Sequence, residues 1–91
     1  MIHYGAAGHL PITARIEQPT PAEVRQAREN ANLSQAQAAS LISSAVTTPY
    51  RTWQGYEVPV GQRGHRQIPL SAWELFLLMS DQHVLYRLKR R

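Results

Sequence analysis

The chain has 91 residues, which allows one domain built around one small hydrophobic core. It contains no cysteine, so neither a disulfide nor a thiolate metal site can supplement that core. The net charge is +4, and all basic residues except Lys89 are arginines, whose planar guanidinium suits phosphate. A basic balance in so small a domain favours a polyanionic partner, although some small basic domains have none.

Membrane insertion and export are not expected from the hydropathy of the chain. The longest apolar run, residues 75–79, is far shorter than a membrane span. The N-terminus has no basic segment followed by a continuous apolar one, so no signal peptide is predicted. The expected location is therefore cytoplasmic, with no membrane partner.

Residues 1–19 are the least regular part of the chain and are expected to form an N-terminal arm. Within it, residues 12–16 alternate between apolar and polar and predict a short strand. Ile12, Ala14 and Ile16 would share one face. A lone strand needs a partner, and residues 83–89 near the other end supply the one plausible candidate. A short β-pairing of the two termini is the accompanying expectation.

The first predicted helix opens with a capping box. Thr20 is the cap, Pro21 takes the first helical position, and Glu23 stands three residues after the cap. Apolar residues then recur on one face, and the helix is expected to end near Ala31. A second helix opens with the same signal.

Ser34 followed by Gln37 forms the second capping box. The apolar face of this helix consists mainly of small residues, which allow another helix to approach closely. It is predicted to run to Ala45 or Val46. Only residues 32–33 separate it from the first helix, so the two must pack at an angle as an αα corner.

A third, short helix follows and ends near Glu57. Thr48 is placed to cap it, and Pro49 sits where a first helical residue needs no free N–H. Trp53 and Tyr56 fall three apart and share one side of the helix. Arg51, Gln54 and Gly55 point elsewhere, with Tyr50 on the exposed edge of the aromatic side. This outer surface suits either solvent or an anionic partner.

Residues 58–67 are predicted to be a loop because prolines and glycines interrupt any regular structure. A third capping box, from Ser71 to Glu74, predicts a last helix that ends near Ser80. The apolar surface of this helix is wide enough for burial on two sides, by the core and by a second subunit. Residues 81–91 form a basic C-terminal segment.

An ordered set of residues between Val24 and Glu57 resembles one known family. Leu33-Ser34-Gln35 matches the opening of its second helix, and Ala39 matches its small residue at the turn. The end of its third helix resembles Arg51-Thr52-Trp53-Gln54 with Tyr56-Glu57. The family is the Cro/repressor (XRE) helix-turn-helix family of phage and bacterial regulators.

The resemblance implies an all-α, compact four- to five-helix, lambda-repressor-like helix-turn-helix domain over residues 20–80. From Ala39 to Glu57 the chain has four more positions than the family pattern. Four residues make about one helical turn. Either the second helix continues for one turn through residues 43–46, or the turn before the third helix is a longer loop.

The resemblance also implies where DNA would bind. In a helix-turn-helix, the second helix of the pair enters the major groove with its N-terminal residues near base edges. Arginine pairs with guanine and glutamine with adenine, while helix N-termini attract phosphate. The implied DNA-binding residues are Gln35, Thr47, Thr48, Tyr50, Arg51, Gln54, Arg63, His65 and Arg66. The resemblance also implies an ion pair between Arg28 of the first helix and Glu57 at the end of the third. Without the resemblance, a solvated face is the favoured interpretation of Arg51 and Gln54.

Catalysis is disfavoured by the absence of any recognisable catalytic motif. The six acidic residues are scattered, and neither a glycine-rich phosphate loop after a strand nor a nucleophile elbow is present. The four histidines lack metal-ligand spacing, so no metal and no cofactor are expected.

Two hypotheses of function follow from the sequence. The first is a sequence-specific, double-stranded DNA-binding transcriptional regulator of the phage or prophage repressor type, acting as a homodimer on an inverted repeat. The second is an antitoxin or adaptor whose main role is to bind a protein partner, with a terminal segment folding onto that partner. Binding to random duplex DNA and its salt dependence discriminate between them.

Overall fold

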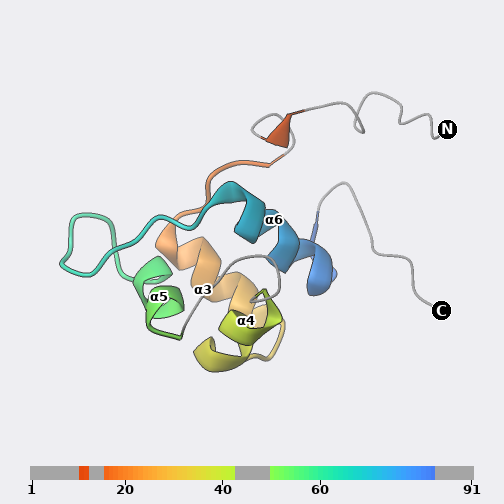
Figure 1. Ribbon diagram of the computed structural model, residues 1–91, viewed down its shortest axis with the longest axis horizontal. Helices are drawn as coiled ribbons and strands as arrows, with labels where there is room; N and C mark the ends of the chain where they lie inside the picture. The colour runs from red at the N-terminus through yellow and green to blue at the C-terminus, as the bar shows by residue number, and fades with distance from the viewer. Residues whose placement is uncertain (1–10, 13–15, 43–49, 84–91) are drawn as a thin grey trace, which may run out of the picture.

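The computed structural model describes residues 11–12, 16–42 and 50–83, and this part of the chain is all-α, as predicted (Figure 1). It contains four helices and no strand. The helices are α3 (Pro21–Asn30), α4 (Gln35–Leu41), α5 (Tyr50–Tyr56) and α6 (Leu70–Met79). None of these helices combines the length and the apolar character needed to cross a bilayer.

Both capping boxes predicted for the first two helices are confirmed. In α3, Thr20 Oγ1 accepts from the Glu23 amide at 3.2 Å, while the Glu23 carboxylate accepts from the Thr20 amide at 2.8 Å. In α4, Ser34 Oγ accepts from the Gln37 backbone amide at 3.0 Å, while Gln37 Oε1 accepts from the Ser34 backbone amide at 2.8 Å. Asn32, with φ of 59°, lies in the left-handed conformation that ends α3 and turns the chain toward α4.

The predicted end of the second helix is wrong. Helix α4 ends at Leu41, and Ile42 has left the helical conformation with φ of −106° and ψ of 5°. The extra residues therefore do not extend α4 without interruption. They fall in segment 43–49, outside the described residues. The prediction followed apolar spacing alone, whereas the serines at positions 43 and 44 favour local hydrogen bonds that compete with a helix.

The capping box predicted for α6 is also wrong. The helix begins at Leu70 with Pro69 as its N-cap, and no side chain caps it. Glu74 instead accepts a hydrogen bond from the buried ring of His83 at 3.0 Å. A buried carboxylate needs a partner, and the chain brings one back from beyond the helix end. That partner lies nine residues after Glu74, and its approach depends on the turn that follows α6, so the local motif gives no sign of it.

The turn after α6 folds residues 81–83 back onto the helices. Asp81 is left-handed with φ of 63°, and the Gln82 amide donates to the Leu77 carbonyl at 2.7 Å. The Gln82 side chain reaches α3, where its Nε2 donates to the Ala27 carbonyl at 3.0 Å. This end of the predicted C-terminal segment therefore belongs to the packed structure.

The predicted strand at residues 12–16 is not what the described backbone forms. The Ile16 amide donates to the Ile12 carbonyl at 3.1 Å, which is the i to i−4 contact of a helical turn. Ile16 is buried against the core, and nearby Gln18 donates to the Ile68 carbonyl at 2.8 Å. Most of the expected partner segment, residues 84–89, lies outside the described residues, as does the intervening Ala14.

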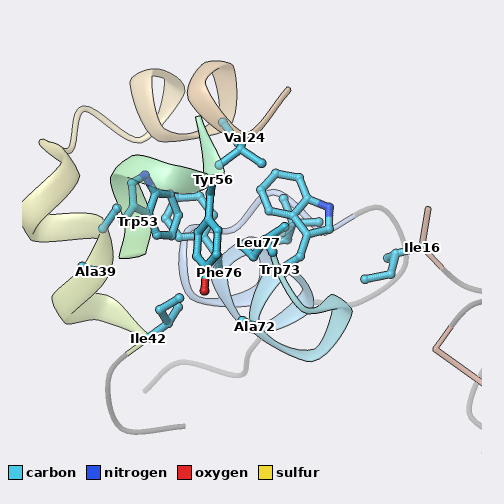
Figure 2. Close-up of a cluster of buried hydrophobic side chains, with 13 residues drawn as sticks. Ile16, Val24, Ala39, Ile42, Trp53, Tyr56, Ala72, Trp73, Phe76 and Leu77 are labelled. Atoms are coloured by element: carbon cyan, nitrogen blue, oxygen red, sulfur yellow. The ribbon is translucent and has the colours of Figure 1, made fainter. Parts of the chain in front are cut away.

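The core is organised around four aromatic rings from α5 and α6. Phe76 lies between Trp53 and Trp73, with ring centroids 5.1 and 6.1 Å away, and Tyr56 packs edge-on against Trp53 at 5.7 Å (Figure 2). Such pairs add to the burial of apolar area. All four rings are buried, so they anchor α5 and α6 in the core. Helix α5 is thereby fixed on its aromatic side.

Candidate functional site

The side of α5 next to α3 and α4 is held by a buried ion pair. Arg28 Nε and Nη2 donate to the two carboxylate oxygens of Glu57 at 2.6 and 3.0 Å. Only 15% of the Arg28 side chain and 7% of the Glu57 side chain are exposed. The third arginine nitrogen, Nη1, donates to the Leu33 carbonyl at 3.0 Å, in the turn between α3 and α4. This two-pronged geometry is the strongest form of an arginine–carboxylate contact.

Two further donors complete the surroundings of the Glu57 carboxylate. Trp53 Nε1 donates to Oε2 at 2.7 Å, and Gln35 Nε2 donates to Oε1 at 3.1 Å. One carboxylate therefore connects α3, the start of α4 and the end of α5. We call Arg28, Gln35, Trp53 and Glu57 the carboxylate hub. Its geometry sets the orientation of α5 relative to the other two helices.

The pKa values of the hub follow from this geometry. Burial by itself raises the pKa of Glu57, but hydrogen bonds from Arg28, Trp53 and Gln35 and the arginine charge outweigh burial and lower it. The hydrogen bond to Glu57 raises the pKa of Arg28, against the opposing effect of burial. Both groups are therefore charged at neutral pH, and the pair contributes to stability there.

Another part of the α5 surface lies next to the hub and is open to solvent. Arg51 and Gln54 are exposed, and Tyr50 is 48% exposed. Gln54 Nε2 donates to the Tyr50 hydroxyl at 2.8 Å, one helical turn earlier. We call these three residues the outer face of α5. Thr47 and Thr48, the other candidates near the start of this helix, lie outside the described residues.

The loop after α5 is docked onto that helix at Gly55. The Gly55 carbonyl accepts from the Arg66 amide at 3.0 Å, and a Cβ at position 55 would lie 2.9 Å from the Gly64 carbonyl oxygen. The sequence interpretation placed Gly55 on the outer surface, and this is wrong because Gly55 is buried. The absence of a side chain is what allows the loop backbone to approach so closely.

Short-range hydrogen bonds give the loop its shape. His65 is half-buried, and its Nδ1 donates to the Val58 carbonyl at 2.7 Å. Gly61 and Gly64 have φ of +89° and +90°, which other residues rarely adopt. Arg63 and Arg66 remain exposed. Of the three loop candidates, the two arginines are thus presented outward, while His65 uses one ring nitrogen to close the loop.

A shallow polar groove brings several candidate residues together. It includes Gln54 from the outer face, Arg63 from the loop and Gln35 from α4. The full lining consists of Arg25, Arg28, Gln35, Gln54, Glu57, Val58, Pro59, Gln62 and Arg63. Gln35 belongs to the hub, where its side-chain amide donates a hydrogen bond to Glu57. A contact between Gln35 and phosphate stays a prediction.

Arg25 is a groove residue that the sequence interpretation did not select for binding. Its side chain is 65% exposed and pairs with Glu29 at 3.3 Å, a surface contact worth little in water. It precedes Arg28 by three positions, so both lie on one face of α3. The three-residue spacing from Arg28 was the sequence feature that could have identified Arg25 as a groove residue.

Metal binding has no geometric support in the part of the chain that the structure describes. No three histidine, aspartate or glutamate side chains gather there in a way that could hold an ion. His83, one of two described histidines, is instead engaged by Glu74.

Comparison with known proteins adds no relative. No protein-family model, no curated protein and no solved structure matches this chain. Functional inference therefore depends on the geometry of these residues and on the motif resemblance carried by residues 24–57.

The hub predicts a specific acid sensitivity. Because the folded pKa of Glu57 is lowered, its stabilising contribution is present above the unfolded pKa of about 4.3 and is lost as pH falls through the folded value. Glu57→Gln should cost about 3–5 kcal/mol at pH 7, since Arg28 is left buried and unpaired. It should also flatten the acid limb of stability, measured by urea unfolding between pH 7 and pH 2.5.

Glu29→Gln is the matched control, because Glu29 is also paired with an arginine but lies exposed. It should shift the unfolding free energy at pH 7 by less than about 1 kcal/mol and keep the acid limb of the wild type. Equal effects of the two substitutions would contradict the special role of Glu57.

Gly55→Ala should lower the free energy of unfolding, which is opposite to what helix propensity alone would give. Alanine normally stabilises a helix interior by about 1 kcal/mol relative to glycine. Here the added methyl group meets the Gly64 carbonyl, a backbone atom that can move only with the loop. A net loss of about 1 kcal/mol or more is expected in urea unfolding. Stabilisation by Gly55→Ala would show that the loop does not dock at this position.

Proposed function

We propose that this protein is a sequence-specific, double-stranded DNA-binding transcriptional regulator of the phage repressor type. In this proposal, α4 and α5 are the two helices of a helix-turn-helix, and α5 enters the major groove. The observation that carries the proposal is the outer face of α5. It exposes Arg51, Gln54 and Tyr50 on a helix whose other sides are fixed by the carboxylate hub and the aromatic core.

The chemistry of the outer face supports recognition of base edges. Arg51 can donate two hydrogen bonds to guanine O6 and N7, and a glutamine amide can pair with adenine. A rigid helix suits this role, because side chains on a fixed backbone reach base edges at small entropic cost. Helix α5 has seven residues and is about 10 Å long, which fits within the major groove.

The surrounding arginines support contact with the DNA backbone. Arg63 and Arg66 extend from the docked loop, and Arg25 lines the groove beside α5. Phosphate contacts supply most of the affinity and set the register, whereas base contacts specify sequence. The net charge of +4 favours the same partner.

We further propose that the regulator acts as a homodimer. One short helix makes few base contacts, and two copies one groove turn apart supply the remaining specificity. The proposed dimer surface is the outer side of α6, together with the terminal segments. Met79 is 38% exposed there, and Leu75 and Leu78 are half-buried.

Salt-dependent binding to random duplex DNA tests the proposal. Each neutralised phosphate contributes a slope of about −0.9 in log K against log salt, so the arginines above should give about −3 or steeper. Fluorescence anisotropy with a labelled duplex, at salt concentrations between about 50 and 300 mM, measures this slope. Arg63→Ala should reduce the slope by about 1. Arg51→Ala should relax the preference at one position of a site selected from a random duplex library, without changing thermal stability.

Absence of duplex binding at low salt would contradict this function. It would favour the antitoxin or adaptor alternative, in which the main partner is a protein. Unchanged site preference in Arg51→Ala would show that α5 is not the reading helix.

A further inference from the structure

The contact between Gln54 and Tyr50 has a consequence for specificity. Gln54 Nε2 donates one of its two protons to the Tyr50 hydroxyl at 2.8 Å. The residues are one turn apart on α5, and both are exposed. An exposed glutamine would otherwise lose rotamer entropy on being fixed at an interface. The hydroxyl fixes the amide before any partner arrives.

What remains of the amide is a defined pattern. Among the described residues, no other group hydrogen bonds to the Gln54 side chain, so Oε1 and the second Nε2 proton stay available. They form one acceptor and one donor side by side. Adenine presents the complement in the major groove, with N6–H as donor and N7 as acceptor. Guanine presents two acceptors and would place one of them against the amide oxygen.

We infer that Tyr50 is a positioning residue that orients the Gln54 amide to read adenine in the major groove. The inference rests on the proposed DNA-binding function and adds to it the base and the residue that sets the selectivity. Tyr50 acts through Gln54, because its hydroxyl accepts one of the two amide protons and leaves the amide oxygen and the other proton for the base. Its ring adds rigidity, because a tyrosine has only two side-chain torsions.

The experiment begins with selection of sites from a random duplex library by the wild-type protein. Dissociation constants are then measured for the selected site and for versions with each other base pair at the adenine position. The variants are Tyr50→Phe, Gln54→Ala and the double substitution, with Arg51→Ala as control. Thermal unfolding checks that these changes of exposed side chains leave the fold intact.

The expected result is a selective loss at one base pair. Gln54→Ala should reduce the preference for adenine about tenfold to one hundredfold, the range for a bidentate contact. Tyr50→Phe should reduce it about threefold to tenfold, as for loss of one hydrogen bond. In the Gln54→Ala background, Tyr50→Phe should have no further effect on the preference. Arg51→Ala should change a different position of the site.

Three results would overturn the inference, and they are distinguishable. A uniform loss of affinity across all bases in Tyr50→Phe would make Tyr50 a backbone contact. A selected site whose preferences do not change in Gln54→Ala would exclude adenine reading by Gln54 while leaving the proposed function in place. Failure of the wild-type protein to enrich any site would remove both.

Discussion

The mutual orientation of α3, α4 and α5 depends on the buried carboxylate of Glu57. Glu57 accepts hydrogen bonds from Arg28, Trp53 and Gln35, and through them it connects the first three described helices. A seven-residue helix cannot persist alone in water, so α5 needs such external contacts. A buried Glu57 carboxylate without its donors would cost free energy of folding. The three donors therefore stabilise the same charge cooperatively.

Helix α5 is packed on part of its surface and exposed on the rest. Trp53 and Tyr56 fix the helix in the core, while the hub fixes its rotation about its own axis. The outer face is therefore presented in one orientation. The loop shares this orientation because it docks on the helix itself at Gly55, so the exposed Arg63 and Arg66 keep their positions relative to the outer face. Reading groups and backbone-binding groups form one rigid unit in the proposed function.

The features predictable from sequence are those encoded within a few residues. The capping boxes at Thr20 and Ser34 need only their own turn, so their helix starts were found. The features that were missed depend on distant partners. Glu74 looked like part of a cap but pairs with a histidine beyond the helix, and Gly55 looked exposed until the loop covered it. Apolar residues continue past Leu41 in the sequence, so apolar spacing did not report the early end of α4.

The candidate site was predictable in its residue types but not in its arrangement. The arginine-carboxylate pair came from the motif resemblance, and its further donors from Trp53 and Gln35 emerged only in three dimensions.

The most direct test of the central claim is backbone amide NMR of the labelled protein titrated with duplex DNA. If α5 and the loop bind DNA, the shifted resonances should gather on the outer face of α5 and on loop residues 58–67. Shifts confined to α6, or none at low salt, would contradict it.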